Sequence, residues 1–80
     1  MKIRILLFGV TRDIVGDTTI EVEVNENENI GAIMTRLRSS YPALNDLRSL
    51  MVAVNSEYAE ESQIITSSDE IALIPPVSGG

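Results

Sequence analysis

The 80-residue sequence contains no cysteine and no histidine. Without cysteine the chain has no disulfide and no thiol chemistry of its own. Without either side chain it has no zinc site of the usual composition, and the usual pair of nucleophile and histidine base is also missing. The composition therefore predicts a chain that catalyses no reaction by itself.

Positive charge is scarce as well. Lys and Arg together number six against 12 Asp and Glu, which gives a formal net charge of −6 at pH 7. Nucleic-acid binding depends on clustered Lys and Arg that neutralise phosphates, so this composition predicts no nucleic-acid partner. The acidity either keeps a small domain soluble or steers it towards a basic partner surface.

Long apolar runs and ligand-binding motifs are absent too. No stretch approaches the roughly 20 apolar residues that span a bilayer, so no membrane partner is predicted. The first residues alternate like a strand and lead into no cleavage site, which indicates a cytoplasmic protein. Gly9 is isolated rather than part of a phosphate loop, so no bound cofactor is predicted. The glutamates between positions 21 and 28 lack the spacing of a cation-binding loop, so no metal site is predicted.

Apolar alternation predicts the strands. Apolar residues recur at every second position in Lys2–Phe8 and in Thr18–Val24, as in strands with one buried face. Leu50–Val54 and Ile71–Ile74 are apolar throughout, which is typical of buried strands, and the last should be central. Two short extended pieces are expected at 58–59 and 63–66.

Helical spacing predicts one main helix over Ile30–Ser40, with Asn29 as its N-cap. One or two helical turns are expected over Val10–Val15, closed by Gly16 in the left-handed conformation. The connection over 43–49 should be irregular apart from a short turn.

The order of these elements predicts one α+β domain over residues 1–74. A hairpin, a helical crossover and a central last strand make up a mixed sheet covered on one face by a helix. Six positions are predicted to lie in the core: Ile5, Val22, Ile33, Leu37, Val52 and Leu73.

Residues 75–80 are predicted to form a separate segment, a flexible and extended C-terminal tail. Pro75 and Pro76 should end the last strand and favour an extended backbone, which at about 3.1 Å per residue reaches roughly 18 Å over six residues. Gly79 and Gly80 carry no Cβ, so a narrow protein channel would admit them together with the terminal carboxylate. The alternative is an ordinary frayed end or a truncated sequence.

The tail Pro75-Pro76-Val77-Ser78-Gly79-Gly80 resembles that of the molybdopterin synthase small subunits (MoaD), which are ubiquitin-like sulfur carriers. The segments Lys2–Gly16, Ala53–Asn55 and Asp69–Ala72 resemble the same family and occur in the same order. Ser67-Ser68 stand where similar proteins usually have Gly before the Asp-Glu pair. The resemblance covers essentially the whole chain and implies a ubiquitin-like β-grasp with the first and last strands parallel at the centre.

The resemblance implies a function for Gly80. An adenylyltransferase of the ubiquitin-activating type would use ATP to adenylate its carboxylate, and a sulfur donor enzyme would convert it to a thiocarboxylate. The tail would then enter the large subunit of molybdopterin synthase and give its sulfur to cyclic pyranopterin monophosphate, in molybdenum cofactor biosynthesis. The assembly implied is a heterotetramer in which the large subunit supplies the catalytic side chains.

Three alternatives remain open from the sequence. A sulfur carrier for thiazole synthesis shares the fold and the terminal Gly-Gly. A ubiquitin-like protein modifier would use the same activated Gly80 to form an isopeptide bond. An interaction module that carries no sulfur would function without both glycines.

The binding residues predicted beside Gly80 are the rest of the tail and two apolar residues at its root. Phe8 is out of register with the buried positions of its strand, and Ile74 is the last residue before the prolines. We expect both on the sheet face that the helix leaves open, as part of an apolar patch for the large subunit. The alternative is that the turn over Val10–Gly16 covers Phe8. The predicted binding set is Gly79, Ser78, Val77, Pro76, Pro75, Ile74 and Phe8.

Overall fold

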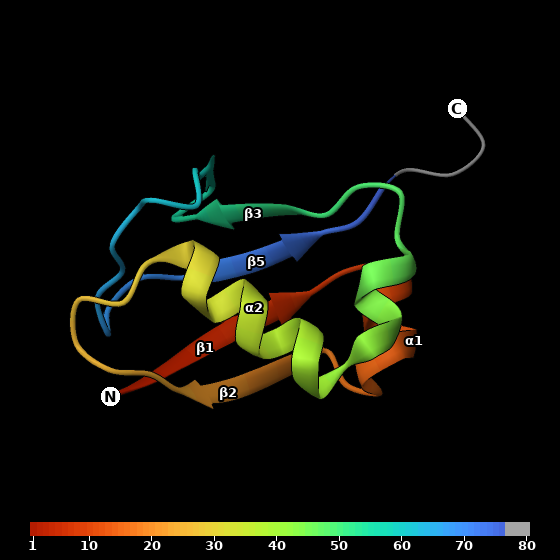
Figure 1. The fold of residues 1–80 in the computed structure, drawn as a ribbon, viewed down its shortest axis with the longest axis horizontal. Coiled ribbons are helices and arrows are strands. Elements are labelled where there is room, and N and C mark those ends of the chain that lie inside the picture. Colours follow the sequence, from red (N-terminus) through yellow and green to blue (C-terminus); the bar gives the residue numbers. More distant parts are fainter. Residues whose placement is uncertain (77–80) are drawn as a thin grey trace.

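The computed structural model describes residues 1–76 of the chain (Figure 1). It contains five strands, two α-helices and one short 3₁₀ helix, η1. In chain order they are β1 (Lys2–Leu7), α1 (Val10–Val15), β2 (Thr19–Glu23), α2 (Ile30–Ser40), η1 (Pro42–Asp46), β3 (Met51–Val54), β4 (Glu57–Tyr58) and β5 (Ile71–Ile74).

The strands form one mixed sheet in the order β2-β1-β5-β3-β4. The first and last strands, β1 and β5, are parallel neighbours at its centre, and the other pairs are antiparallel. Helix α2 crosses one face of the sheet, while α1 lies at the end where β1 and β5 finish (Figure 1). This arrangement confirms the predicted β-grasp with its single covering helix.

The core lies between the sheet and α2. On β1 the alternating residues Ile3, Ile5 and Leu7 are each at most 1% exposed, and on β5 Ile71 and Leu73 pair beside them. The apolar stripe of α2 packs onto this face, because its residues recur at helical spacing. Of the six predicted core positions, Ile5, Ile33, Leu37, Val52 and Leu73 are buried as expected.

Val22 is the exception, because it is only partly buried. It faces the helix side, opposite Ile3, but it lies on the edge strand β2. A hollow lined by Val22 lies between β2 and the second half of α2, so this edge is covered less completely. The alternation of the strand predicted the correct face of Val22 but not the depth of its burial.

Three other expectations need correction. Strand β1 ends at Leu7 rather than Phe8, because the backbone N–H of Phe8 donates to the Thr11 side chain instead of a neighbouring strand. The run Leu50–Val54 is not buried throughout: Met51 is 45% exposed, since no helix of residues 1–76 covers the second face of the sheet. The piece at 63–66 is no strand and makes only an isolated bridge between Ile64 and Asn29.

The remaining boundaries shift by one or two residues. β2 lacks the predicted first and last residues, and the return strand β4 begins one residue earlier than expected. The connection after α2 contains the 3₁₀ helix η1, which begins at Pro42, a residue well suited to a helix start. The left-handed Gly16 and the end of β5 at Ile74, before the two prolines, are confirmed.

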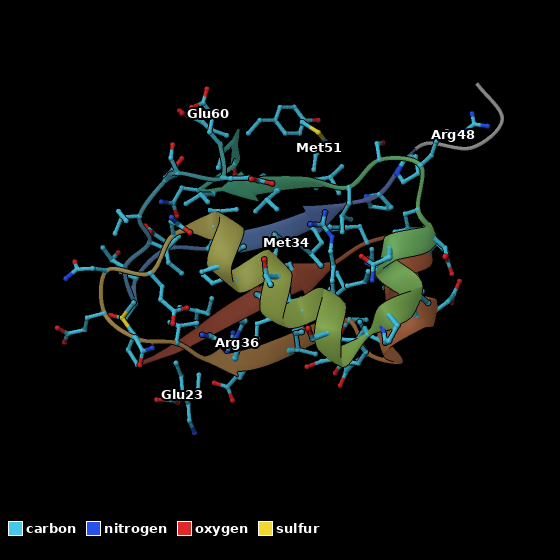
Figure 2. All side chains as sticks on the ribbon, in the orientation of Figure 1. Glu23, Met34, Arg36, Arg48, Met51 and Glu60 are labelled. Carbon is cyan, nitrogen blue, oxygen red and sulfur yellow. The ribbon has the colours of Figure 1, made fainter. Side chains whose placement is uncertain are left out.

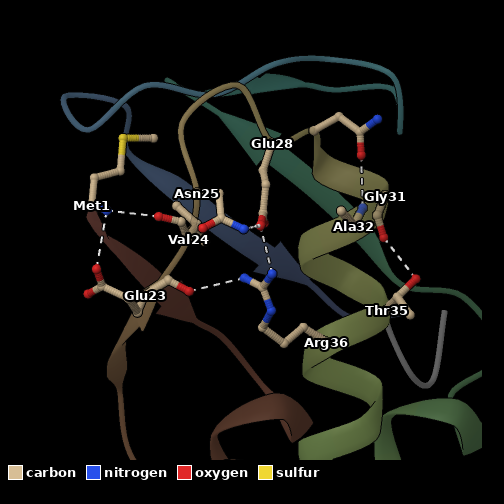
Figure 3. A network of polar contacts seen from close by, with 10 residues as sticks. Met1, Glu23, Val24, Asn25, Glu28, Gly31, Ala32, Thr35 and Arg36 are labelled. Carbon is tan, nitrogen blue, oxygen red and sulfur yellow. Dashed lines mark hydrogen bonds and ion pairs between the residues drawn. The ribbon is translucent and has the colours of Figure 1, made fainter.

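A polar network fixes the start of α2 and the edge of the sheet at the end opposite α1 (Figure 3). The Asn29 side chain accepts a hydrogen bond from Ala32 N at 2.9 Å and thus caps α2. Arg36 donates to the Glu23 carbonyl at 3.0 Å and to Glu28 Oε1 at 2.7 Å. The hydrogen bond from Arg36 lowers the pKa of Glu28, so this carboxylate is ionised at neutral pH.

Candidate functional site

The candidate site lies where the two central strands end. Because β1 and β5 are parallel, their carboxyl ends meet at the same end of the sheet. Phe8 follows β1 and Pro75 follows β5, so the first turn of the chain and the root of the tail become neighbours. The sequence separates these residues by most of the chain, and the parallel pairing brings them together.

The turn between β1 and α1 is held by the Thr11 side chain, which is fully buried. Its Oγ1 accepts a hydrogen bond from Phe8 N at 3.0 Å and donates one to Phe8 O at 2.5 Å. Arg12 adds a hydrogen bond from Nε to Leu7 O at 2.9 Å, and its guanidinium lies 5.6 Å from the centre of the Phe8 ring. These contacts hold the Phe8 backbone in place and set its side chain on the open face of the sheet.

A groove of about 320 Å³ lies on this open face, and we call it the tail-root groove. Its floor consists of Leu6, Ala72 and Ala53, which pair across β1, β5 and β3. The two alanines at the centre leave a hollow between the larger side chains around them. Paired strands keep a fixed spacing, so these side chains cannot close the gap by moving the strands together. The lining residues are Leu6, Phe8, Ala53, Ser56, Tyr58, Glu70, Ala72 and Ile74.

Large apolar side chains around the groove are open to solvent. Phe8 is 39% exposed, Tyr58 69% and the nearby Met51 45%, so apolar surface gathers on one half of this face. Met51 pairs with Ile74 across β3 and β5 and extends the apolar surface to the place where the tail begins. An exposed apolar patch of this kind, bordered by polar residues, is a common mark of a partner surface.

Charged residues occupy the other half of the open face. Lys2 and Arg4 of β1 stand directly opposite Glu23 and Glu21 of β2. Cross-strand pairs of opposite charge are favourable and explain these side chains without a ligand. At the tail end of the sheet the chain has positive residues: Arg12 lies over Phe8, and Arg48 lies at the same end of the molecule (Figure 2).

The structure places the predicted site residues as follows. Phe8 and Ile74 line the same groove, and Phe8 is 39% exposed rather than covered by α1; that this patch binds a partner stays a prediction. Pro75 and Pro76 follow directly and are partly buried. The remaining predicted residues, Val77, Ser78, Gly79 and Gly80, lie outside the described residues.

Sequence reasoning missed Tyr58 and Leu6 as groove residues. Strand alternation alone would have placed Leu6 beside Phe8 on the open face. Tyr58 could not be found in this way, because its position depends on the turn of Asn55 and Ser56, which both adopt positive φ, of 53° and 71°. Only the resulting pairing of Tyr58 with Ala53 brings it to the groove.

A second hollow, of about 720 Å³, lies between β2 and the second half of α2. Its lining mixes both signs of charge, with Arg4 and Arg36 beside Asp17, Glu21 and Glu23. Within residues 1–76 no cluster of His, Cys, Asp and Glu is suited to hold a metal ion. No helix in that part of the chain is long and apolar enough to cross a membrane.

Comparison with known proteins gives one family match and several full-length relatives. The profile of the ThiS family matches residues 5–80. The molybdopterin synthase sulfur carrier subunit of Dictyostelium discoideum is 36% identical over 83 residues, which cover 99% of this chain and 96% of the relative. That of Mycobacterium tuberculosis is 35% identical over 82 residues, which cover 100% of this chain and 99% of the relative.

A protein of different name is similar as well. Small archaeal modifier protein 1 of Haloferax volcanii is 30% identical over 83 residues, which cover 92% of this chain and 95% of the relative. The crystal structure of SAMP1 from Haloferax volcanii superposes with a TM-score of 0.85 at 29% identity, covering all of both chains. Sulfur carrier subunits and a modifier protein thus resemble this sequence, and the modifier protein also shares this fold.

Proposed function

Because this chain belongs to the ThiS family, we propose that it is the sulfur carrier subunit of a molybdopterin synthase. The observation that carries the proposal is the position of the tail root. The central strand β5 runs directly into Pro75 and Pro76 beside an exposed apolar groove, and the sequence then continues to Gly79-Gly80. The names of full-length relatives at 35–36% identity support the same role.

The reacting group in this proposal is the Gly80 carboxylate. A carboxylate is a poor electrophile at neutral pH because it is ionised and has no good leaving group. An activating adenylyltransferase lets a carboxylate oxygen attack the α-phosphorus of ATP, which forms the acyl-adenylate and releases pyrophosphate. Hydrosulfide from a sulfur donor enzyme then attacks the carbonyl carbon, AMP leaves, and the product is the terminal thiocarboxylate.

The thiocarboxylate sulfur is the nucleophile of the second stage. It forms a bond to a carbon of cyclic pyranopterin monophosphate in the large subunit while the bond from that carbon to an oxygen of the acceptor breaks, and water then hydrolyses the resulting thioester to Gly80. This step returns the carboxylate and leaves the sulfur on the acceptor. The chain has no histidine or cysteine for acid–base work, so the large subunit supplies those side chains and ATP is bound by the activating partner.

The tail-root groove is the docking surface of the large subunit in this account. Phe8, Tyr58 and Met51 offer exposed apolar area on a rigid sheet, and Arg12 and Arg48 stand near the tail end. Aromatic and methionine side chains are enriched in protein interfaces, and anchors on rigid elements lose little entropy on binding. A partner that binds at this groove would contact the chain directly beside the start of the tail.

A second candidate function is protein modification, which the similarity to small archaeal modifier protein 1 favours. The activated Gly80 would then acylate a lysine amine, with loss of AMP, rather than accept sulfur. The two functions differ in the product, an isopeptide conjugate against a thiocarboxylate. They are therefore distinguished by the identity of the acceptor.

The test is a pair of tail variants. Deleting Gly80, or adding one residue after it, should abolish sulfur transfer to the acceptor in an assay with purified large subunit. Thermal melting should stay unchanged, because a tail beyond the sheet adds little to stability. Normal transfer by the extended variant would contradict the carrier proposal, and lysine conjugates without transfer would favour the modifier.

A further inference from the structure

Gly9 stands against the root of the tail. A Cβ at this position would lie 3.1 Å from Pro75 Cγ, closer than most side-chain contacts in proteins. The backbone of Gly9 has φ +54° and ψ −134°, a conformation that residues with a Cβ rarely adopt. Two independent features therefore favour glycine here: the backbone conformation and the approach of the Pro75 ring.

The turn that carries Gly9 has little freedom to move away from Pro75. Thr11 holds Phe8 on one side through its two side-chain hydrogen bonds, and Thr11 is fully buried. On the other side Gly9 O accepts a hydrogen bond from Arg12 N at 3.0 Å, and Arg12 Nε donates a hydrogen bond to Leu7 O. The turn is thus tied to both β1 and α1.

Pro75 is equally constrained. Ile74, immediately before it, pairs with Met51 in the sheet, and the proline ring fixes its own φ. With both partners held, the contact between Gly9 and Pro75 limits the direction in which the chain leaves β5. A side chain at position 9 has to push the proline, and everything after it, to a new path.

We propose that Gly9 is a positioning residue: by lacking a Cβ, it seats Pro75 against the β1–α1 turn and sets the direction of the tail. The geometric part concerns the contact alone, whereas its consequence for sulfur transfer rests on the proposed function. Reactions that depend on a positioned group lose up to about 100-fold in rate for a displacement of 1 Å. A redirected tail should therefore slow transfer more than it weakens docking.

The chain offers a matched control. Gly16 also has positive φ, +88°, but no heavy atom of residues 1–76 lies within 4 Å of the Cβ that a substitution would add. Gly16→Ala therefore introduces backbone strain at the other end of α1 without touching Pro75. Pro75→Ala removes Cγ, so the double variant Gly9→Ala/Pro75→Ala keeps the strain and relieves the contact.

The direction of the tail is measured first. The chain has no cysteine, so introduced cysteines at Glu21 and Ser78 are unique sites for spin labels. The distance distribution between them should shift in Gly9→Ala and stay unchanged in Gly16→Ala. In the double variant it should match that of Pro75→Ala alone.

Sulfur transfer is measured second, on unlabelled thiocarboxylated chains with purified large subunit. Gly9→Ala should lower kcat about 10- to 100-fold with little change in the affinity for the large subunit. If Gly9→Ala does not fold, Thr11→Val tests the same turn between β1 and α1. This variant removes both hydrogen bonds to Phe8 and should broaden the distance distribution.

Each outcome decides one of the two claims. An unchanged distance distribution in Gly9→Ala, or an equal shift in Gly16→Ala, would overturn the positioning role. Distances that shift as expected, in a chain whose native form never accepts sulfur, would support the geometry and refute the proposed function. Shifted distances with an unchanged kcat would show that the direction of the tail does not matter for transfer, which also overturns the inference.

Discussion

Phe8 is the side chain on which the proposed docking surface depends most. It is 39% exposed, lines the tail-root groove and is held by the hydrogen bonds of Thr11 to its backbone. Phe8→Ser should weaken binding to the large subunit by about 1–2 kcal/mol, roughly 5- to 30-fold in Kd, because an aromatic anchor loses its buried area. Titration calorimetry with purified large subunit measures the change.

Val10 supplies the control for this variant. It is 40% exposed, nearly the same as Phe8, but it is not part of the groove lining. Val10→Ser should leave Kd unchanged, and circular dichroism should show both variants folded. Equal affinity of the native chain and Phe8→Ser would place Phe8 outside the interface.

The groove shows which residues of the site the sequence could predict. Phe8 and Ile74 were predictable because strand alternation placed them on the open face and because parallel central strands end together. Gly9 and Thr11 were not predictable in their roles, since these arise from the contact with Pro75 and from burial at a turn. Periodicity reports the face on which a residue lies, and it carries no information on contacts between distant turns.

Helix α2 stabilises the domain through Leu37, which is 3% exposed. Leu37→Ala should lower the free energy of unfolding by about 2–5 kcal/mol, because it removes buried methyl groups and leaves a cavity. Val22→Ala, on the partly covered edge strand, should cost clearly less. Urea unfolding of both variants measures the difference, and a larger loss at Val22 would contradict the described packing of α2.

The turn before β5 should make stability depend on pH through Asp69. Its carboxylate accepts hydrogen bonds from Thr66 N at 2.8 Å and from Asn55 Nδ2 at 2.9 Å. The backbone bond from Thr66 is the main cause that lowers the pKa of Asp69, followed by the side chain of Asn55. The ionised group therefore stabilises the fold above its ordinary pKa of about 4, and this contribution is lost as the pH falls through the lowered value.

The variant Asp69→Asn tests this dependence. It should unfold at lower urea concentration than the native chain at pH 7. The difference should shrink as the pH falls below the ordinary pKa of about 4, because Asp69 then takes up a proton, first in the unfolded state and at lower pH in the folded state. The same change at the exposed Asp46 controls for the loss of one negative charge. A difference that stays constant from pH 7 to pH 3 would show that Asp69 stabilises the turn by another means.

Most elements were predictable because each has a local signal. The periodicity of α2, the cap at Asn29 and the prolines after β5 gave correct bounds. The bounds of β4 and the single bridge at Ile64 were not predictable, because they depend on pairing with distant segments. Neither Ser67 nor Ser68 has a positive φ. The turn before Asp69 therefore does not require a glycine at the position where the family resemblance would place one.

In the molecule as a whole, the residues that stabilise the fold and the residues of the candidate site lie on opposite faces of the sheet. One face of the sheet and α2 form the core, the other face presents the groove, and the strand at the centre leads into the tail. Because β5 is paired on both sides, by β1 and β3, the root of the tail continues directly from the hydrogen-bonded centre of the sheet. In the proposed function, such a scaffold positions the reacting atom, and the partner supplies the catalytic side chains.

The most direct test of the sulfur-carrier function is the intact mass of the chain. It is purified from cells competent in molybdenum cofactor synthesis and compared with the Gly80-deleted variant from the same cells. The native chain should show a population in which one oxygen is replaced by sulfur, and fragment ions should place the replacement at Gly80. A thiol-alkylating reagent should label only that population, because the chain has no cysteine. A native chain that carries no sulfur while its partners are active, or one that carries sulfur equally after loss of Gly80, would contradict the function proposed here.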